Sequence, residues 1–166
     1  MRVIRQHTFG GPEVLRIEEV PRPEPTLTEV LVRVHATGVN PVDWWTRAGG
    51  GVSEVLGPFP WTVGWDVAGV VEDVGFGVSR FKPGDPVYGM PWFPRAAGAY
   101  AEYVTAPSRQ LALMPSTLDF VQAAALPLAA LTAELNLDVA GVRAGQRVLV
   151  NAAAGGVGHL ADAAGR

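Results

Sequence analysis

Short stretches of alternating apolar and polar residues fill most of the first 115 residues. The clearest covers residues 29–40, where Val30, Val32 and Val34 fall on one face of an extended chain. A period of two is typical of a half-buried β-strand. Several short strands with glycine and proline between them predict a β-barrel or β-sandwich. The other apolar runs predict strands over residues 2–6, 15–20, 66–74, 87–89, 99–105 and 109–113.

After Pro115 the pattern becomes helical. Residues 116–119, Ser-Thr-Leu-Asp, match a capping box, in which side chains satisfy the free N–H groups at a helix start. A short alanine-rich helix is expected to follow. Pro127 suits the first turn of a second helix over residues 128–139, and Gly141 suits its end.

Residues 147–159 combine an apolar run, a glycine-rich turn and a helix start. The run Val-Leu-Val at 148–150 predicts a short buried strand. The pattern Ala153-x-Gly155-x-x-Gly158 follows, and a helix that starts after such a turn presents backbone N–H groups to a phosphate. The alternative is an ordinary glycine-rich turn.

The position of this motif near the last residue, Arg166, shapes the expected domain organisation. A dinucleotide-binding sheet uses about six strands, and only one is predicted after the helices. We therefore expect a β-rich domain over residues 1–115. Residues 116–166 are expected to form a helical connection and the start of a truncated dinucleotide-binding domain.

Composition and charge exclude several classes of protein. Hydrophobic residues make up 48% of the chain and charged residues 17%, as in soluble globular proteins. The net charge is −3 without a basic patch, so no nucleic-acid partner is expected. No apolar run reaches membrane-spanning length, and the N-terminus lacks the apolar region of a signal peptide. A cytoplasmic protein without membrane contact is therefore expected.

Five stretches, in order, resemble the N-terminal half of the zinc-independent medium-chain dehydrogenases/reductases, in the quinone oxidoreductase (zeta-crystallin-like) branch. They cover residues 9–15, 29–34, 38–43, 64–71 and 152–158. The resemblance implies a GroES-like barrel as the catalytic domain over residues 1–115. It further implies helices and the first strand, glycine turn and helix of a truncated Rossmann α/β domain. The implied chemistry is hydride transfer between NADP(H) and a small-molecule quinone, enone or carbonyl substrate.

The resemblance and the composition together argue against a metal site. Zinc-dependent relatives carry a cysteine after the third long strand and Gly-His-Glu where this chain has Gly-Trp-Asp at 64–66. Asn40 stands near the cysteine position, and the chain contains no cysteine at all. The three histidines lie in separate segments. We therefore expect no metal, and we expect hydrogen bonds to polarise the substrate carbonyl.

The resemblance assigns catalytic roles to Asn40, Trp45 and Thr132. Asn40 resembles a pocket asparagine near the nicotinamide or substrate, although it could instead satisfy a turn. Trp45 stands where relatives often have a tyrosine, so an indole N–H replaces a hydroxyl. Thr132 resembles a threonine beneath the nicotinamide, although a mid-helix threonine can simply bond back to its own turn. The expected cofactor-binding residues are Asn40, Thr132, Ala154, Gly155, Gly156, Val157 and Gly158.

Two carboxylates near these residues are expected to be structural. Asp43 and Asp66 have the chemistry of general acids or bases. The alternative, that each is a structural carboxylate capping a turn, is favoured.

Two classes of function follow from these observations. The first is an NADP(H)-dependent quinone or enone reductase, of which residues 1–166 alone would be inactive or impaired. The second is a non-redox GroES-like binding or interaction module without a cofactor domain. An unpaired apolar strand edge at 148–150 would also either favour self-association through residues 128–160 or leave that segment mobile.

Overall fold

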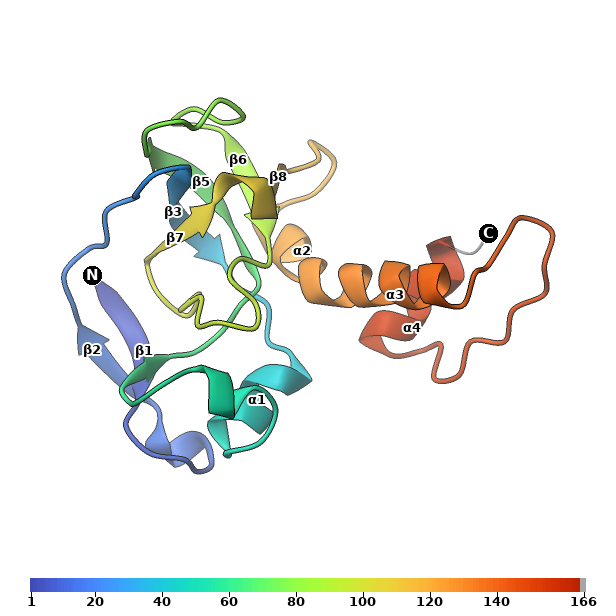
Figure 1. The fold of residues 1–166 in the computed structure, drawn as a ribbon, viewed down its shortest axis with the longest axis horizontal. Coiled ribbons are helices and arrows are strands. Elements are labelled where there is room, and N and C mark those ends of the chain that lie inside the picture. The colour runs from blue at the N-terminus through green and yellow to red at the C-terminus, as the bar shows by residue number, and fades with distance from the viewer. Residues whose placement is uncertain (165–166) are drawn as a thin grey trace.

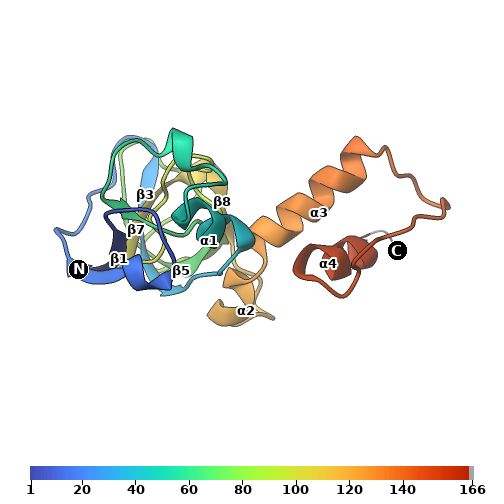
Figure 2. The ribbon, with the colours of Figure 1, turned by 90° about the horizontal axis from the view of Figure 1, so that it is seen from below.

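The computed structural model describes residues 1–164, which form a β-rich body and a helical arm that projects from it (Figures 1 and 2). The strands are β1 (Arg2–Gln6), β2 (Arg16–Glu19), β3 (Glu29–Ala36), β4 (Trp61–Thr62), β5 (Val67–Val74), β6 (Pro86–Gly89), β7 (Tyr103–Pro107) and β8 (Leu111–Leu113). The helices are α1 (Pro41–Arg47), α2 (Phe120–Ala124), α3 (Pro127–Val139) and α4 (Gly156–Ala164). Short 3₁₀ turns cover Pro12–Val14, Ser53–Val55 and Ser108–Gln110.

The described strands form two antiparallel sheets. The larger sheet has the order β7-β3-β5-β6-β8 and the smaller has the order β2-β1-β4. A bridge between Val3 and Ala101, together with a bond from the Ile4 N–H to the Tyr100 carbonyl at 2.8 Å, joins them. The predicted β-rich domain followed by helices is confirmed.

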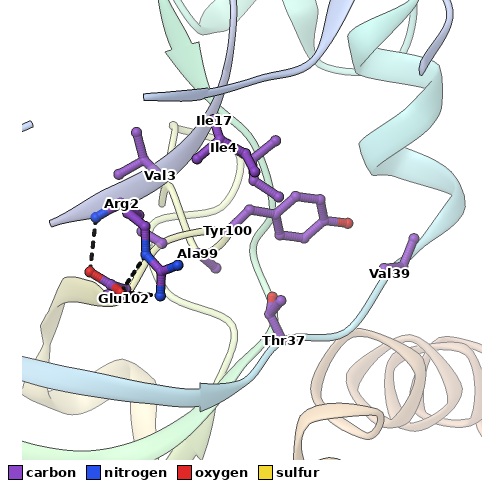
Figure 3. A pocket seen from close by; sticks show the side chains of 10 residues that line it. Arg2, Val3, Ile4, Ile17, Thr37, Val39, Ala99, Tyr100 and Glu102 are labelled. Atoms are coloured by element: carbon purple, nitrogen blue, oxygen red, sulfur yellow. Dashed lines mark hydrogen bonds and ion pairs between the residues drawn. The ribbon is translucent and has the colours of Figure 1, made fainter. Parts of the chain in front are cut away.

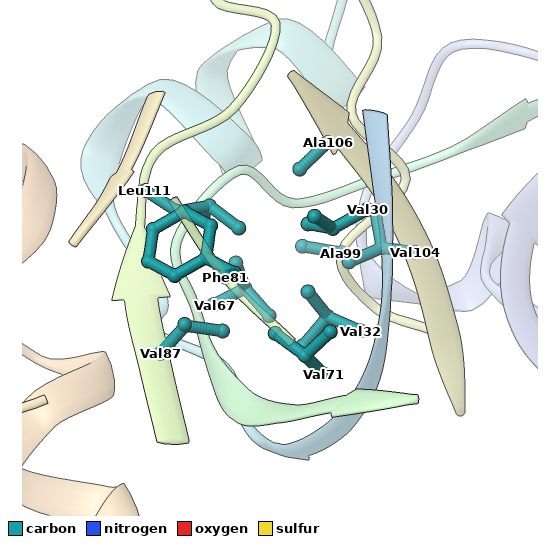
Figure 4. Packing of buried hydrophobic residues seen from close by; sticks show 10 residues of the cluster. All are labelled: Val30, Val32, Val67, Val71, Phe81, Val87, Ala99, Val104, Ala106 and Leu111. Carbon is teal, nitrogen blue, oxygen red and sulfur yellow. The ribbon is translucent and has the colours of Figure 1, made fainter. Parts of the chain in front are cut away.

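The larger sheet encloses the main hydrophobic core (Figure 4). Val30 and Val32 lie in this core, as their alternation predicts. Leu31, on the opposite face of β3, is buried as well, so β3 is covered on both faces there rather than on one. The buried members of the core are Val30, Val32, Val67, Val71, Phe81, Val87, Ala99, Val104, Ala106 and Leu111.

Helix α2 begins later than the sequence pattern predicts. The capping pair is Asp119 and Gln122: the Gln122 N–H donates to Asp119 Oδ1 at 2.8 Å, and the Asp119 N–H donates to Gln122 Oε1 at 3.1 Å. Ser116 was expected to start this helix, but the backbone turns at that point, with the Leu118 N–H bonded to the Pro115 carbonyl. The later acidic cap prevails because its partner three residues on completes the reciprocal box.

Helix α3 begins and ends as predicted. Pro127 occupies its first position, and Gly141 follows its end with a φ of 65°, a conformation that glycine adopts without steric cost. In Figures 1 and 2, α3 leaves the body beside α2, and α4 lies along it. Within residues 1–164, no helix combines the length and apolar character needed to cross a membrane.

The predicted strand at 148–150 is wrong. These residues have no regular secondary structure, and Leu149 is 95% exposed. A strand exists only where a neighbour satisfies its N–H and carbonyl groups. None of the strands in the described part of the chain lies beside this run, so its β-branched residues remain in an open loop between α3 and α4.

Candidate active site

Three elements of the fold meet at the carboxylate of Asp66, directly before β5. Asp66 is fully buried, and its Oδ2 accepts a hydrogen bond from Asn40 Nδ2 at 2.7 Å. Its Oδ1 accepts from the N–H of Leu128 at 3.0 Å. Leu128 lies in the first turn of α3, where N–H groups have no partner within the helix. The expectation that Asp66 is a structural carboxylate is therefore confirmed, although it caps the start of a helix rather than a turn.

A second buried carboxylate supports the start of α1. Asp43 Oδ2 accepts from the N–H of Asn40 at 2.6 Å and from the Tyr100 hydroxyl at 2.9 Å. Its Oδ1 has no hydrogen-bond partner among the described residues. The bond to the Asn40 N–H caps α1, as expected for a structural carboxylate.

Burial raises the pKa values of this acidic cluster. Removal from water raises the pKa of Asp66 to about 6, against the opposing effect of its bonds from Asn40 and Leu128, and the nearby charge of Asp43 adds to the rise. Burial also raises the pKa of Asp43. Burial and then the charge of Asp43 raise the pKa of Tyr100, which therefore stays protonated as a hydrogen-bond donor.

The junction at Asp66 connects one of the three predicted catalytic residues, Asn40, with the start of the helix that carries another, Thr132. Asn40 contacts the carboxylate directly, and Thr132 lies one helical turn after Leu128, roughly 6 Å along α3. Thr132 Oγ1 donates to the Leu128 carbonyl at 2.7 Å, so its hydroxyl bonds back to its own turn and keeps its acceptor lone pairs.

Trp45 lies apart from this junction. Its side chain is on α1 and is 58% exposed. The indole ring lies over Gly50, where a Cβ would overlap the ring. The indole Nε1 is the ring atom nearest to that position, so the N–H lies beside the backbone at Gly50.

Sequence reasoning missed the contributions of Tyr100 and Thr37. Tyr100 reaches Asp43 across 57 residues, and Thr37 Oγ1 donates to the Asp66 carbonyl at 2.6 Å across 29 residues. No spacing pattern in the sequence signals such contacts. Gly38 lies within one of the resembling stretches, and the structure explains why a glycine stands there. A Cβ at this position would lie 2.6 Å from the Ala124 carbonyl oxygen.

A cavity of about 370 Å³ opens beside Tyr100 (Figure 3). Its walls come from β1, β2 and the segments around Thr37 and Ala99. The ion pair between Arg2 and Glu102, with an Nη2–Oε1 distance of 2.8 Å, lies at its rim. The remaining lining is mainly apolar, and it includes Val39, which immediately precedes Asn40.

The glycine turn has the geometry of a helix start, with one difference from expectation. Residues 151–155 form a turn, and α4 begins at Gly156. The N–H of Gly155 donates to the Ala152 carbonyl at 2.9 Å, so this amide, expected to be open, is already paired. A Cβ at Gly158 would overlap the Ala152 carbonyl oxygen, so only glycine lets α4 start this close to the turn.

The remaining amides of this turn suit an anion. The N–H groups of residues 156–158 lie in the first turn of α4 and have no acceptor within the helix. Residues 151–156 are exposed, and a Cβ at Gly156 would meet no atom within 4 Å. A phosphate group fits such an open helix start. Ala154 lies in the exposed turn and Val157 is half-buried in α4.

No metal-binding cluster of His, Cys, Asp or Glu exists within residues 1–164. Each of the three histidines contacts another group. His7 contacts Glu18 at 2.5 Å, and His35 stacks on Phe120 with ring centroids 4.2 Å apart. The third, His159, contacts the Gly155 carbonyl in the same turn of α4.

Comparison with known proteins gives consistent matches. Residues 26–116 match the family described as the alcohol dehydrogenase GroES-like domain. Quinone oxidoreductase from Rattus norvegicus is 46% identical over 160 residues, which cover 95% of this chain and 47% of the rat protein. The structure of the quinone oxidoreductase from Coxiella burnetii has a TM-score of 0.93 and 41% identity, covering 99% of this chain and 53% of that one.

A third similar protein was solved with a cofactor. Escherichia coli quinone oxidoreductase, in complex with NADPH, has a TM-score of 0.85 and 33% identity, and the match covers 99% of this chain and 50% of that one. The chain spans about half the length of the curated relatives it matches.

Proposed function

Because the chain belongs to the medium-chain dehydrogenase/reductase family through its GroES-like domain, we propose that it provides the catalytic domain of an NADP(H)-dependent reductase. The proposed substrates are quinones, enones or other activated carbonyl compounds. The similarity to quinone oxidoreductases, one of them solved with NADPH, supports this choice. Residues 1–166 alone are proposed to be inactive or impaired.

The observation that carries this proposal is the junction at Asp66. One buried carboxylate holds both Asn40 and the start of α3, and α3 carries Thr132. Hydride transfer requires the reacting groups to be held within a fraction of an ångström of a productive geometry. Side chains anchored on one shared group meet that requirement better than side chains on independent loops.

The proposed cofactor site uses residues from both parts of the chain. The N–H groups of residues 156–158, at the start of α4, would hold the pyrophosphate, with Ala154 and Gly155 shaping the turn before them. Asn40 and Thr132 would lie against the nicotinamide, and bound NADPH supplies the hydride. On the substrate side, the Trp45 indole N–H can donate a hydrogen bond to a carbonyl oxygen, although it has no proton to release.

This proposal is tested by titrating NADPH into residues 1–166 and following backbone and side-chain amides by NMR. We expect binding no tighter than about millimolar, equivalent to roughly 4 kcal/mol, because one phosphate-binding turn carries most of the affinity. Chemical shifts of residues 154–158, Asn40 and Thr132 should move together. Quinone-dependent NADPH oxidation by this polypeptide should be negligible.

A matched pair of variants sharpens the test. Gly158→Val should abolish the shifts at the turn, because its side chain would overlap the Ala152 carbonyl. Ala163→Val, on the exposed C-terminal part of α4, should leave them unchanged. If millimolar NADPH moves none of these resonances, the reductase proposal is wrong and the alternative, a non-redox GroES-like binding module, takes its place. Micromolar binding would contradict the proposed impairment of the isolated chain.

We further propose that the isolated chain self-associates through its helical arm. The strand edge at 148–150, which was expected to drive self-association, does not form. The proposal rests instead on exposed apolar side chains. Leu131, Leu135 and Val139 lie on successive turns of α3 and are 58%, 62% and 81% exposed. With Leu149 they place a set of large apolar groups on one arm, where a second copy would cover them.

A further inference from the structure

A groove of about 570 Å³ lies where the β-rich body meets the helical arm, and we propose that it binds an organic anion with an apolar body. One wall is formed by β6, β8 and the turn Ser108–Gln110, and the other by the first turns of α3. Small-molecule sites have volumes of roughly 300–1,000 Å³. The groove is separate from the proposed reductase site, because neither Asn40 nor Thr132 lines it.

The body wall of the groove is held in place by strand pairing. Gly89 of β6 pairs with Leu111 of β8, and a Cβ at Gly89 would lie 2.5 Å from the Gln110 carbonyl oxygen. The Gln110 side chain is fixed as well, because its Oε1 accepts a hydrogen bond from the Trp92 N–H at 2.8 Å. A ligand at this wall therefore meets groups that need little reordering.

Polar side chains on the body wall have donors that no described residue uses. Arg109 is exposed and forms no ion pair within residues 1–164. The Gln110 Nε2 hydrogens and the Tyr88 hydroxyl also lack an acceptor among these residues. A carboxylate accepts from several donors at once, and a guanidinium can meet it with two parallel N–H groups. The body wall therefore suits an anionic group.

The space between the walls is mainly apolar. Met90 and Leu111 contribute to it from the body, and Pro127, Ala130 and Leu131 contribute from α3. Leu131 is 58% exposed, so an apolar occupant would remove this side chain from water. The occupant is therefore expected to carry an apolar body beside its charge.

Glu134 decides where in the groove the charge of the occupant lies. It is exposed on the α3 wall, and it forms no ion pair with Arg109 although the two side chains have opposite charges. A carboxylate repels a second anion, so an anionic group would lie beside Arg109 and Gln110. A cation would find a single carboxylate among the residues that line the groove. The lining therefore favours an occupant with one negative charge.

An occupant of this groove would contact the body and the arm at once. The start of α3 is tied to the body by the bond from the Leu128 N–H to Asp66 Oδ1 at 3.0 Å. A ligand bound to Arg109 and packed on Leu131 adds a second connection, three residues further along α3. We expect such a ligand to restrict the movement of the arm, as an effector does, rather than to react.

The test uses three probes that share one apolar body and differ in charge: phenylbutyrate, phenylbutanol and phenylbutylamine. Each is titrated into residues 1–166 while backbone amides are followed by NMR, at a protein concentration at which sedimentation shows a monomer. Phenylbutyrate should bind at least about fivefold more tightly than phenylbutanol, because only its carboxylate pairs with Arg109. Its shifts should centre on residues 109–112 and 130–134. Phenylbutylamine should bind no better than the alcohol.

Variants at exposed positions assign this preference to the groove. Arg109→Gln should reduce the affinity for phenylbutyrate to that for phenylbutanol and leave the affinity for the alcohol unchanged. Arg143→Gln is the matched control, because Arg143 is an exposed arginine in the loop after α3 and does not line the groove. It should bind all three probes as wild type does. Glu134→Gln should bind phenylbutyrate about twofold more tightly, since a repulsive charge is removed.

Several outcomes would overturn the inference. Equal affinities for the three probes, or shifts centred on Leu135 and Leu149, would show non-specific apolar contact with the arm. Tighter binding of the amine would assign the groove to a cation. Groove resonances that move with protein concentration but not with phenylbutyrate would assign it to a second copy of the chain. None of these measurements uses NADPH or a quinone, so their outcome is independent of the proposed reductase function.

Discussion

Similar apolar side chains are buried in the β-rich body and exposed in the helical arm. Val30, Val32 and Val67 in the body are 0% exposed, whereas Val148 and Leu149 in the arm are 46% and 95% exposed. Both regions contain apolar β-branched runs with strand-like patterns. The body pairs its runs: β3 has β5 on one side and β7 on the other. The arm has no partner strand for its run within the described residues.

This contrast between the body and the arm shows that an apolar run becomes a strand only where a partner strand is available. Pairing on both sides satisfies the backbone of β3 and places its side chains in a closed core. The loop before α4 has the same kind of residues, but its backbone is not paired with another strand and its side chains do not lie in a closed core. The arm is held instead by helix packing, in which α4 lies against α3. The contrast can be tested by changes in each region.

The largest expected effect comes from a matched pair of leucines. Leu111→Ala should lower the free energy of unfolding by about 2–5 kcal/mol, because Leu111 is 3% exposed in the main core and its removal leaves a cavity. Leu149→Ala should change it by less than about 0.5 kcal/mol. Urea unfolding followed by circular dichroism measures both. Equal losses in the two variants would show that the loop before α4 is packed in solution.

A smaller effect is expected on self-association. Leu135→Ser and Leu149→Ser should each weaken it about tenfold, since burial of one leucine contributes about 1.5–3 kcal/mol. Ile17→Ser is the matched control, because Ile17 is 76% exposed but lies on β2 in the body. Sedimentation velocity over a range of concentrations gives the dissociation constants. A wild-type protein that is monomeric at all concentrations would contradict self-association. Weaker self-association in the Ile17 variant alone would place the contact on the body rather than on the arm.

The smallest expected effect is the change in the free energy of unfolding with pH that Asp66 causes. Asp66 lies where the β-rich body meets the start of α3. The pKa of Asp66 is raised to about 6 in the folded protein from 3.8, so the native state binds this proton more tightly than the unfolded chain. The resulting stabilisation is fully present below the unfolded pKa and is lost as the pH rises through about 6. Lowering the pH from about 7 to about 5 should therefore stabilise wild type relative to D66N by about 1 kcal/mol.

Chemical unfolding of wild type and D66N at both pH values measures this difference. Other groups that titrate, including Asp43, contribute to both proteins and cancel in the comparison. The same change in stability with pH in both proteins would show that Asp66 does not titrate in this range.

The local features of the fold could be predicted from the sequence because local chemistry decides them. The alternation at 29–40 follows from the period of a strand, and the body contains enough such runs to pair with one another. Proline at the start of α3 and glycine after its end act through their own backbone preferences. Asn40 and Thr132 were chosen as candidates through resembling motifs, which are also local in sequence.

Only the tertiary structure decided how these parts combine. The bonds that build the site join Asp66 to Leu128 across 62 residues and Tyr100 to Asp43 across 57, and no sequence period relates such positions. The same holds for the run at 148–150, where the sequence pattern was right about composition and wrong about structure. A strand, a buried carboxylate and an oriented amide are each defined by what lies opposite them. Folding selects those neighbours from distant parts of the chain.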